Sequence, residues 1–185
     1  MKLKSLIFIA FFISTSECIA QEEYEKTEVV QTDEGFQLLR NGAPYYVRGA
    51  GGNKHLKELA YIGGNSIRTW STANGKAVLD SAHKHGLTVC MGLWVSHERH
   101  GFDYNDEYSV EAQLKGFKEA IIKHKDHPAL LMWAVGNEVD LFYSNFRVWN
   151  AIEDVAAMVK GLDPNHPTMT VTAGIDVAEV SMIKE

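Results

Sequence analysis

The sequence predicts an α/β fold, a (β/α) barrel, on two observations. Strand-like and helical segments alternate along most of the chain, which indicates a parallel sheet with right-handed crossovers. Consecutive strands also end in residues suited to chemistry, namely Arg68 and Trp70, then Trp94, then Asn137 and Glu138. A barrel brings all its strand ends to one mouth, whereas a doubly wound open sheet offers a single switch point. We therefore expect the barrel rather than the open sheet.

The expected elements begin with a flexible, charged lead-in over residues 21–34 and a short β-hairpin. Its arms are residues 36–39 and 45–47, around the turn-rich Asn41-Gly42-Ala43-Pro44. Residues 48–53 are rich in glycine but lack the spacing of a phosphate loop, so we expect a sharp exit from the second arm. Helices are expected at 55–62, 76–85, 108–125, 146–162 and from 176, and strands at 65–70, 88–95, 130–135 and 168–172. With the second arm as first strand, the chain holds about five βα units and is one domain from residue 35 to 185.

The N-terminus predicts an exported protein. A basic start, an apolar stretch from Leu6 to Ile13 and a small, polar end at Ala20 form the layout of a secretory signal peptide over residues 1–20. The apolar stretch is shorter than the ~20 residues that span a bilayer, so no stable membrane insertion is expected. We therefore expect a secreted or periplasmic protein. Without the signal, Cys90 is the one remaining cysteine, which excludes an internal disulfide and suggests a small buried residue.

Nucleic-acid binding and metal binding are not expected. The formal net charge is −6, and no cluster of Lys and Arg is present. In His97-Glu98-Arg99-His100 the histidines are three apart instead of the four of a zinc-binding H-E-x-x-H helix. His83 and His85 differ by two positions, which places them on different faces of a helix.

The strand at 130–135 carries the main candidate residue. It is wholly apolar, with Asp126-His127-Pro128 before it and Gly136-Asn137-Glu138 after it, which is typical of a strand buried on both faces. Glu138 is thereby held at the rim of an apolar scaffold, where a carboxyl group can serve as a general acid. Trp133 is expected in the core, and Asp140 and Glu98 as solvated loop acids.

Gly136-Asn137-Glu138 after a Trp-containing strand, with Ile67-Arg68-Thr69-Trp70 two strands earlier, resembles the retaining glycoside hydrolases built on a TIM barrel. These include the clan A β-galactosidase, mannanase, cellulase and glucanosyltransferase families. The resemblance extends from about residue 45 to 172 and implies hydrolysis of a β-linked poly- or oligosaccharide, with carbohydrate as partner and without a cofactor. It implies that Glu138 is the general acid/base, that Asn137 binds the sugar 2-hydroxyl, and that Arg68 orients the catalytic carboxylates. Such enzymes use two carboxyl groups about 5 Å apart.

Other candidate site residues have two interpretations. Trp70 and Trp94 either pack in the barrel or stack on the apolar face of a sugar at its mouth. His97, just past the third strand, is a candidate for contact with a sugar. Asn137 is alternatively a turn-former, and Arg68 a structural ion-pair partner.

Two departures from the pattern accompany the resemblance. In the β-galactosidase-like families the arginine strand continues into His-Tyr-Pro, whereas this chain has Thr69-Trp70-Ser71-Thr72. The resemblance also places the nucleophile at the end of a seventh strand, and no acid here is assigned to that role. We therefore expect an incomplete barrel that lacks the nucleophile and is itself inactive. The alternatives are a non-catalytic fragment that at most binds carbohydrate, and a β-glucan transglycosylase.

Overall fold

The computed structural model describes residues 25–174, so the expected signal peptide and the helix expected from residue 176 lie outside the described residues. The larger of two sheets is parallel and has five strands within this range, β4 to β8 in sequence order. The strands are β4 (Gly49–Gly51), β5 (Ser66–Arg68), β6 (Thr88–Leu93), β7 (Leu130–Val135) and β8 (Thr168–Thr170).

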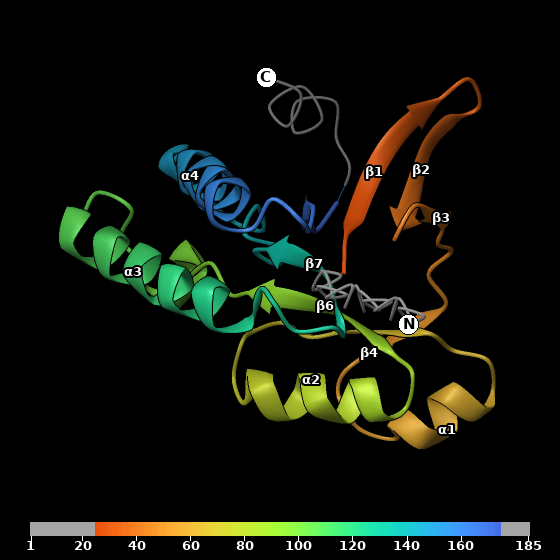
Figure 1. The fold of residues 1–185 in the computed structure, drawn as a ribbon. Helices are drawn as coiled ribbons and strands as arrows, with labels where there is room; N and C mark the ends of the chain where they lie inside the picture. Colours follow the sequence, from red (N-terminus) through yellow and green to blue (C-terminus); the bar gives the residue numbers. More distant parts are fainter. Residues whose placement is uncertain (1–24, 175–185) are drawn as a thin grey trace, which may run out of the picture.

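Helices cover the outside of this sheet. Figure 1 shows α1 (Leu56–Tyr61), α2 (Gly75–Lys84), α3 (Glu107–His124) and α4 (Arg147–Leu162) following one another around it. The strand order never reverses, as it does at the switch point of a doubly wound sheet. Parallel pairing in unbroken order is how strands follow one another around the wall of a (β/α) barrel. The α/β class and the parallel sheet are confirmed.

The N-terminal part differs from the expectation. Residues 27–32, expected in a flexible lead-in, form β1 (Thr27–Thr32), which pairs antiparallel with β2 (Gly35–Arg40). The β-branched residues of β1 face a complementary strand across a two-residue turn, and that pairing orders the segment. The second arm of the expected hairpin is not 45–47 but β3 (Ala43–Pro44), which pairs with β2.

The first parallel strand was also misplaced, because it is β4 and not residues 45–47. Gly49 and Gly51, which we expected in a sharp exit from a strand, lie in the strand itself. A Cβ at Gly49 would lie 2.5 Å from the carbonyl oxygen of Ser66, so glycine lets β4 approach β5.

The small sheet is joined to the N-terminal side of the larger one. Arg40 Nη2 donates to the carbonyl of Pro128 at 2.6 Å, just before β7 begins. The backbone N–H of Thr27 donates to the carbonyl of Asn165 at 2.8 Å, in the turn before β8. The β1–β3 sheet therefore lies opposite the edge where the strands end.

The core lies between the sheet and its helices. Its fully buried apolar side chains come from strands β5 to β7 and from helices α2 to α4, among them Ile67, Leu79, Val89, Met91, Leu93, Ile121, Trp133, Val135 and Val155. Trp133 is confirmed as a core residue. Cys90 is buried on β6, and burial raises the pKa of its thiol to about 11, which makes it a poor nucleophile. None of the helices in residues 25–174 combines the length and apolar character that crossing a membrane requires.

Candidate active site

The chain leaves β7 along a path fixed on both sides. The N–H of Gly136 (φ 76°) donates to the carbonyl of Leu93 at 2.9 Å, which extends the pairing with β6 beyond the strand. The N–H of Glu138 donates to the carbonyl of Val171, beyond β8, at 2.7 Å. Glu138 itself has a φ of 52°, in the left-handed region. Asn137 and Glu138 therefore lie between the ends of β6 and β8, the two strands that flank β7.

Asn137 is joined to Arg68 across the mouth. Arg68 Nη2, at the end of β5, donates to Asn137 Oδ1 at 2.8 Å. With its oxygen occupied by a guanidinium, the Asn137 amide has its Nδ2 hydrogens left to donate. No partner for that nitrogen is present among residues 25–174. The structure thus brings together two predicted residues that lie 69 positions apart.

Glu138 is half-buried, and its carboxylate has no hydrogen-bond partner within the described range. Its backbone, in contrast, is bonded at both ends: the N–H donates to Val171, and the carbonyl accepts a 2.8 Å hydrogen bond from Arg99 Nη1. The residue combines a fixed main chain with an available acid. That is the requirement for a group that exchanges protons with a ligand.

His97 lies behind Asn137 rather than at the open mouth. Only 2% of its surface is exposed, and its Nε2 lies 2.6 Å from the carbonyl of Asn137. A carbonyl accepts only, so Nε2 carries the proton. Burial lowers the pKa of His97, which favours this neutral form. The expected contact with a sugar is not supported by this geometry, because the ring is enclosed and its Nε2 is used.

The loop acids are placed differently from the prediction. Asp140 is buried, and its carboxylate accepts from the N–H of Ala173 at 2.8 Å and 3.0 Å, so it joins the loops after β7 and β8. Glu98, in the short helix η1 (Glu98–His100), accepts from the N–H groups of Asn145 at 3.0 Å and Ser144 at 2.8 Å. These bonds, the Asn145 one first, hold the pKa of Glu98 below its ordinary value. Neither acid is a free solvated group.

Two of the predicted tryptophans are at the mouth. Trp70 and Trp94 have 43% and 38% of their surface exposed, after β5 and β6 respectively. The Arg68 guanidinium carbon lies 5.8 Å from the centre of the Trp70 ring, within the range of a cation–π contact. The Trp94 ring centre lies 4.8 Å from that of His97. Each ring is thus supported by a residue that also contacts Asn137.

The concave face of the sheet forms a cavity of about 520 Å³. Its lining is mainly apolar, and Arg68 is the one charged residue that the described part of the chain contributes to it. Other lining residues come from all five strands or the segment before them, and include Val47, Ala50, Cys90, Met132 and Met169. Within residues 25–174, no group of three or more His, Cys, Asp or Glu side chains is arranged to hold a metal ion.

Residues 53–184 match the family model described as "Glycosyl hydrolases family 2, TIM barrel domain". The chain belongs to glycosyl hydrolase family 2. The match includes Arg68, Asn137 and Glu138 and identifies the parallel sheet as part of a TIM barrel. Of the barrel glycosidases that the sequence resembles, the matched family belongs to the β-galactosidase-like group. The match holds although the chain lacks the His-Tyr-Pro segment after Arg68.

Curated relatives of this family 2 chain have glycosidase names. A β-glucuronidase of Pongo abelii is 27% identical over 157 residues, which is 74% of this chain and 23% of the relative. A β-galactosidase of Vibrio vulnificus is 23% identical over 175 residues, which is 83% of this chain and 16% of the relative. The chain thus spans about a quarter or less of the length of these relatives.

Solved structures have the same fold. A β-D-glucuronidase of Dictyoglomus thermophilum superposes with a TM-score of 0.63 at 22% identity, over 81% of this chain and 29% of that one. A Bifidobacterium dentium β-glucuronidase, complexed with coumarin-3-O-glucuronide, gives 0.65 at 19% identity, over 83% and 27%.

The residues that sequence reasoning missed are those that hold the backbone. Glu98, Arg99 and Asp140 bind main-chain groups of the loops after β7 and β8. A pattern of residue types carries no signal for bonds to a distant main chain. The one indication was the adjacent charged pair Glu98-Arg99 in the loop that follows a strand.

Proposed function

We propose that this chain is the acid/base part of a retaining β-glycosidase, with Glu138 as the general acid/base. The observation that carries the proposal is the available Glu138 carboxylate beside an asparagine that Arg68 holds at 2.8 Å. Membership of family 2 and the β-glucuronidase and β-galactosidase names of its relatives support a β-glycoside as substrate. A β-glucuronide or a β-galactoside is the substrate class to test first.

In the proposed reaction a second carboxylate attacks the anomeric carbon while Glu138 donates its proton to the glycosidic oxygen. The bond from that carbon to the leaving oxygen breaks, and the aglycone departs as an alcohol. Water then attacks the glycosyl ester, and Glu138 takes up the proton that the water loses. We assign no nucleophile among residues 25–174.

Asn137 is proposed to donate its free Nδ2 hydrogens to the sugar 2-hydroxyl. Arg68 is proposed to orient that amide, because it occupies Oδ1 and so determines which way the donors point. It is also proposed to lie near the attacking carboxylate. Trp70 and Trp94 are proposed to stack on the apolar faces of sugar rings at the mouth, where their exposed surfaces lie.

Variants of Glu138 in the full-length protein test this function. Glu138→Gln is expected to slow a glycoside with a poor leaving group by about 10²–10⁴-fold, because proton donation to the leaving oxygen is lost. A dinitrophenyl glycoside of the same sugar needs little protonation and should be cleaved at a rate much closer to that of the unchanged protein. Azide should accelerate Glu138→Ala by attacking the glycosyl ester without base catalysis, and should give a glycosyl azide of retained configuration.

The control is Glu119→Gln, on the exposed part of α3. It should leave both rates unchanged. Equal slowing of both substrates by Glu138→Gln, with no effect of azide on Glu138→Ala, would disprove the assignment.

We further propose export to the periplasm or the medium, on the residues at positions 1–20 alone. N-terminal sequencing of the protein from its native host should begin at Gln21. An N-terminus that retains residues 1–20 would contradict export by cleavage.

A further inference from the structure

Three consecutive residues after β6 bind the backbone of the loop that carries Glu138. His97 Nε2 donates to the carbonyl of Asn137 at 2.6 Å. Arg99 Nη1 donates to the carbonyl of Glu138 at 2.8 Å and, more weakly, to that of Leu141 at 3.4 Å. Glu98 accepts from the N–H of Ser144 at 2.8 Å and of Asn145 at 3.0 Å. Each bond goes to main chain, so this segment holds the path of the loop.

The loop needs holding because its backbone is strained. Glu138 has a φ of 52° and Phe142 one of 59°, both in the left-handed region. That region costs an ordinary L-residue about 1–2 kcal/mol, and a bulky residue such as Phe142 is an outlier there. Between them a turn closes through the 3.2 Å bond from the N–H of Leu141 to the carbonyl of Glu138. Arg99 contacts the carbonyls at both ends of this turn.

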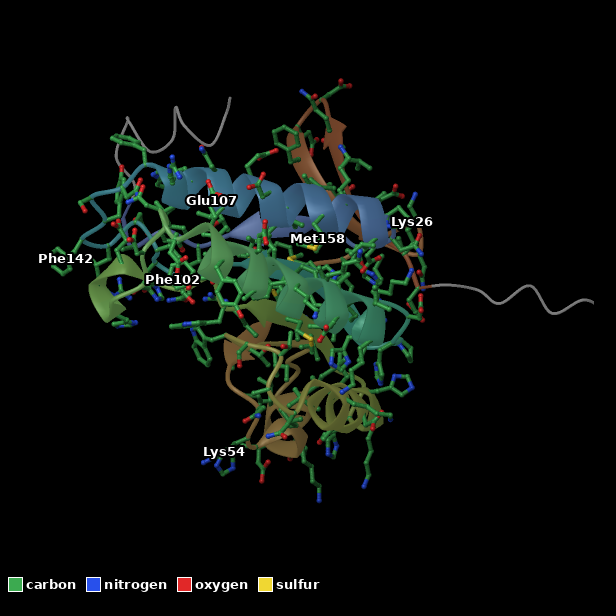
Figure 2. The ribbon with its side chains drawn as sticks, turned by 90° about the vertical axis from the view of Figure 1, so that its left-hand side faces the viewer. Lys26, Lys54, Phe102, Glu107, Phe142 and Met158 are labelled. Carbon is green, nitrogen blue, oxygen red and sulfur yellow. The ribbon has the colours of Figure 1, made fainter. Side chains whose placement is uncertain are left out.

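The outer side of this turn is not stabilised by burial of a side chain. Phe142 has 81% of its surface exposed, and Figure 2 shows its side chain directed away from the body of the molecule. Packing of Phe142 therefore does not offset the strain. On this side of the loop Arg99 donates to two carbonyls and Glu98 accepts from two N–H groups, while Tyr143 packs on Trp149 of α4.

The segment that holds the loop is itself anchored. The N–H of Ser96 donates to Gln113 Oε1 of α3 at 2.7 Å, and the Tyr104 hydroxyl donates to the carbonyl of Ser96. Tyr104 is buried. The segment that carries Arg99 is therefore joined to α3 and the core at Ser96, three residues before Arg99.

We propose that Arg99 is a positioning residue for the acid/base, which acts by holding the Glu138 carbonyl and with it the left-handed conformation of Glu138. The direction of the Cα–Cβ bond follows from φ and ψ, so this conformation aims the carboxyl group. Without Arg99 the residue relaxes toward negative φ, and its carboxyl group leaves the line to the glycosidic oxygen. A displacement of 1 Å at a reacting group can slow a reaction about 10²-fold. The inference rests on the proposed role of Glu138.

The test is Arg99→Ala in the full-length protein, alone and combined with Glu138→Gln. The single variant is expected to slow a poor-leaving-group glycoside by about 10²-fold and a dinitrophenyl glycoside of the same sugar by less than about 10-fold. If Arg99 acts through Glu138, the double variant should be no slower than Glu138→Gln alone. Equal slowing of both substrates, or an additive loss in the double variant, would overturn the proposal.

Two further variants separate positioning from folding. Arg99→Lys keeps the charge and donor hydrogens on one nitrogen but lacks the rigid, planar guanidinium that fixes their direction, so its ratio of rates on the two substrates should lie between those of the unchanged protein and Arg99→Ala. An unchanged ratio would overturn the proposal even if Arg99→Ala did not fold. Arg147→Ala, an exposed arginine at the start of α4, is the matched control and should leave the ratio unchanged. Failure of the proposed function is recognised separately, because Glu138→Gln itself would then show no dependence on the leaving group.

Discussion

Trp133 Nε1 donates a 2.7 Å hydrogen bond to Asp163 Oδ2, which joins the middle of β7 to the residue that ends α4. Both residues are at most 2% exposed. Asp163 also accepts from His166 Nδ1 at 2.9 Å and from the N–H of Asn165 at 3.2 Å. One buried carboxylate thus satisfies three donors beneath the strand that presents Glu138.

Asp163→Ala should therefore lower the free energy of unfolding by about 3 kcal/mol, since it leaves the buried Trp133 and His166 donors unpaired. Asp163→Asn keeps an acceptor for Trp133 and should lose less. Denaturant unfolding followed by tryptophan fluorescence measures both. Asp154→Ala, on the exposed part of α4, is the control and should change stability by less than about 0.5 kcal/mol. A loss at Asp163→Ala no larger than at Asp154→Ala would contradict the role of this carboxylate.

Two glycines provide a paired prediction. A Cβ at Gly92 on β6 would lie 2.5 Å from the carbonyl oxygen of Trp70 and 2.6 Å from that of Thr69, both backbone atoms. Gly92→Ala should therefore separate β6 from the end of β5 and destabilise the protein by about 1–3 kcal/mol. Gly116 on α3 has nothing within 4 Å of such an atom, so Gly116→Ala should stabilise by about 0.5–1 kcal/mol. If the melting temperatures of both variants shifted in the same direction, the packing argument would be refuted.

The regular elements were largely predictable because their signal is local. The prediction for β7 agrees with the structure at both ends, Leu130 and Val135, since a wholly apolar run between polar borders has few other interpretations. The prediction failed at β4, where Gly49 has no β propensity. A close approach to Ser66, visible only in three dimensions, makes glycine fit there.

The site was predictable only in its outline. Strand order placed Arg68 near Asn137, and the structure has these side chains in direct contact. The environments of His97 and Asp140 were not predictable, because each side chain binds main chain of a loop far away in sequence. Residue type alone does not distinguish a buried acid with backbone donors from a solvated one.

Stability should rise with pH through the histidine range. Burial lowers the pKa of both His97 and His124 from the ordinary 6.5. Below pH 6.5 the unfolded chain then binds more protons than the folded one, so stability present above this pH is lost as the pH falls toward the lowered values. Melting temperatures should fall from pH 7.5 to 5.5. His124→Gln, away from the proposed site, should reduce that slope, and an unchanged slope would show that His124 does not titrate as described.

Asn137 offers the sharpest separation of binding from folding, because its two amide atoms have different partners. Asn137→Asp keeps an oxygen for Arg68 but removes the Nδ2 donor, whereas Asn137→Ala removes both. If the donor binds the 2-hydroxyl in the transition state, both variants should lower kcat/KM by about 10²-fold or more on the normal glycoside. On the 2-deoxy glycoside, which lacks the acceptor, Asn137→Asp should have little effect. Should Asn137→Asp retain full activity on the normal glycoside, the amide would be a structural partner of Arg68 and not a ligand of the sugar.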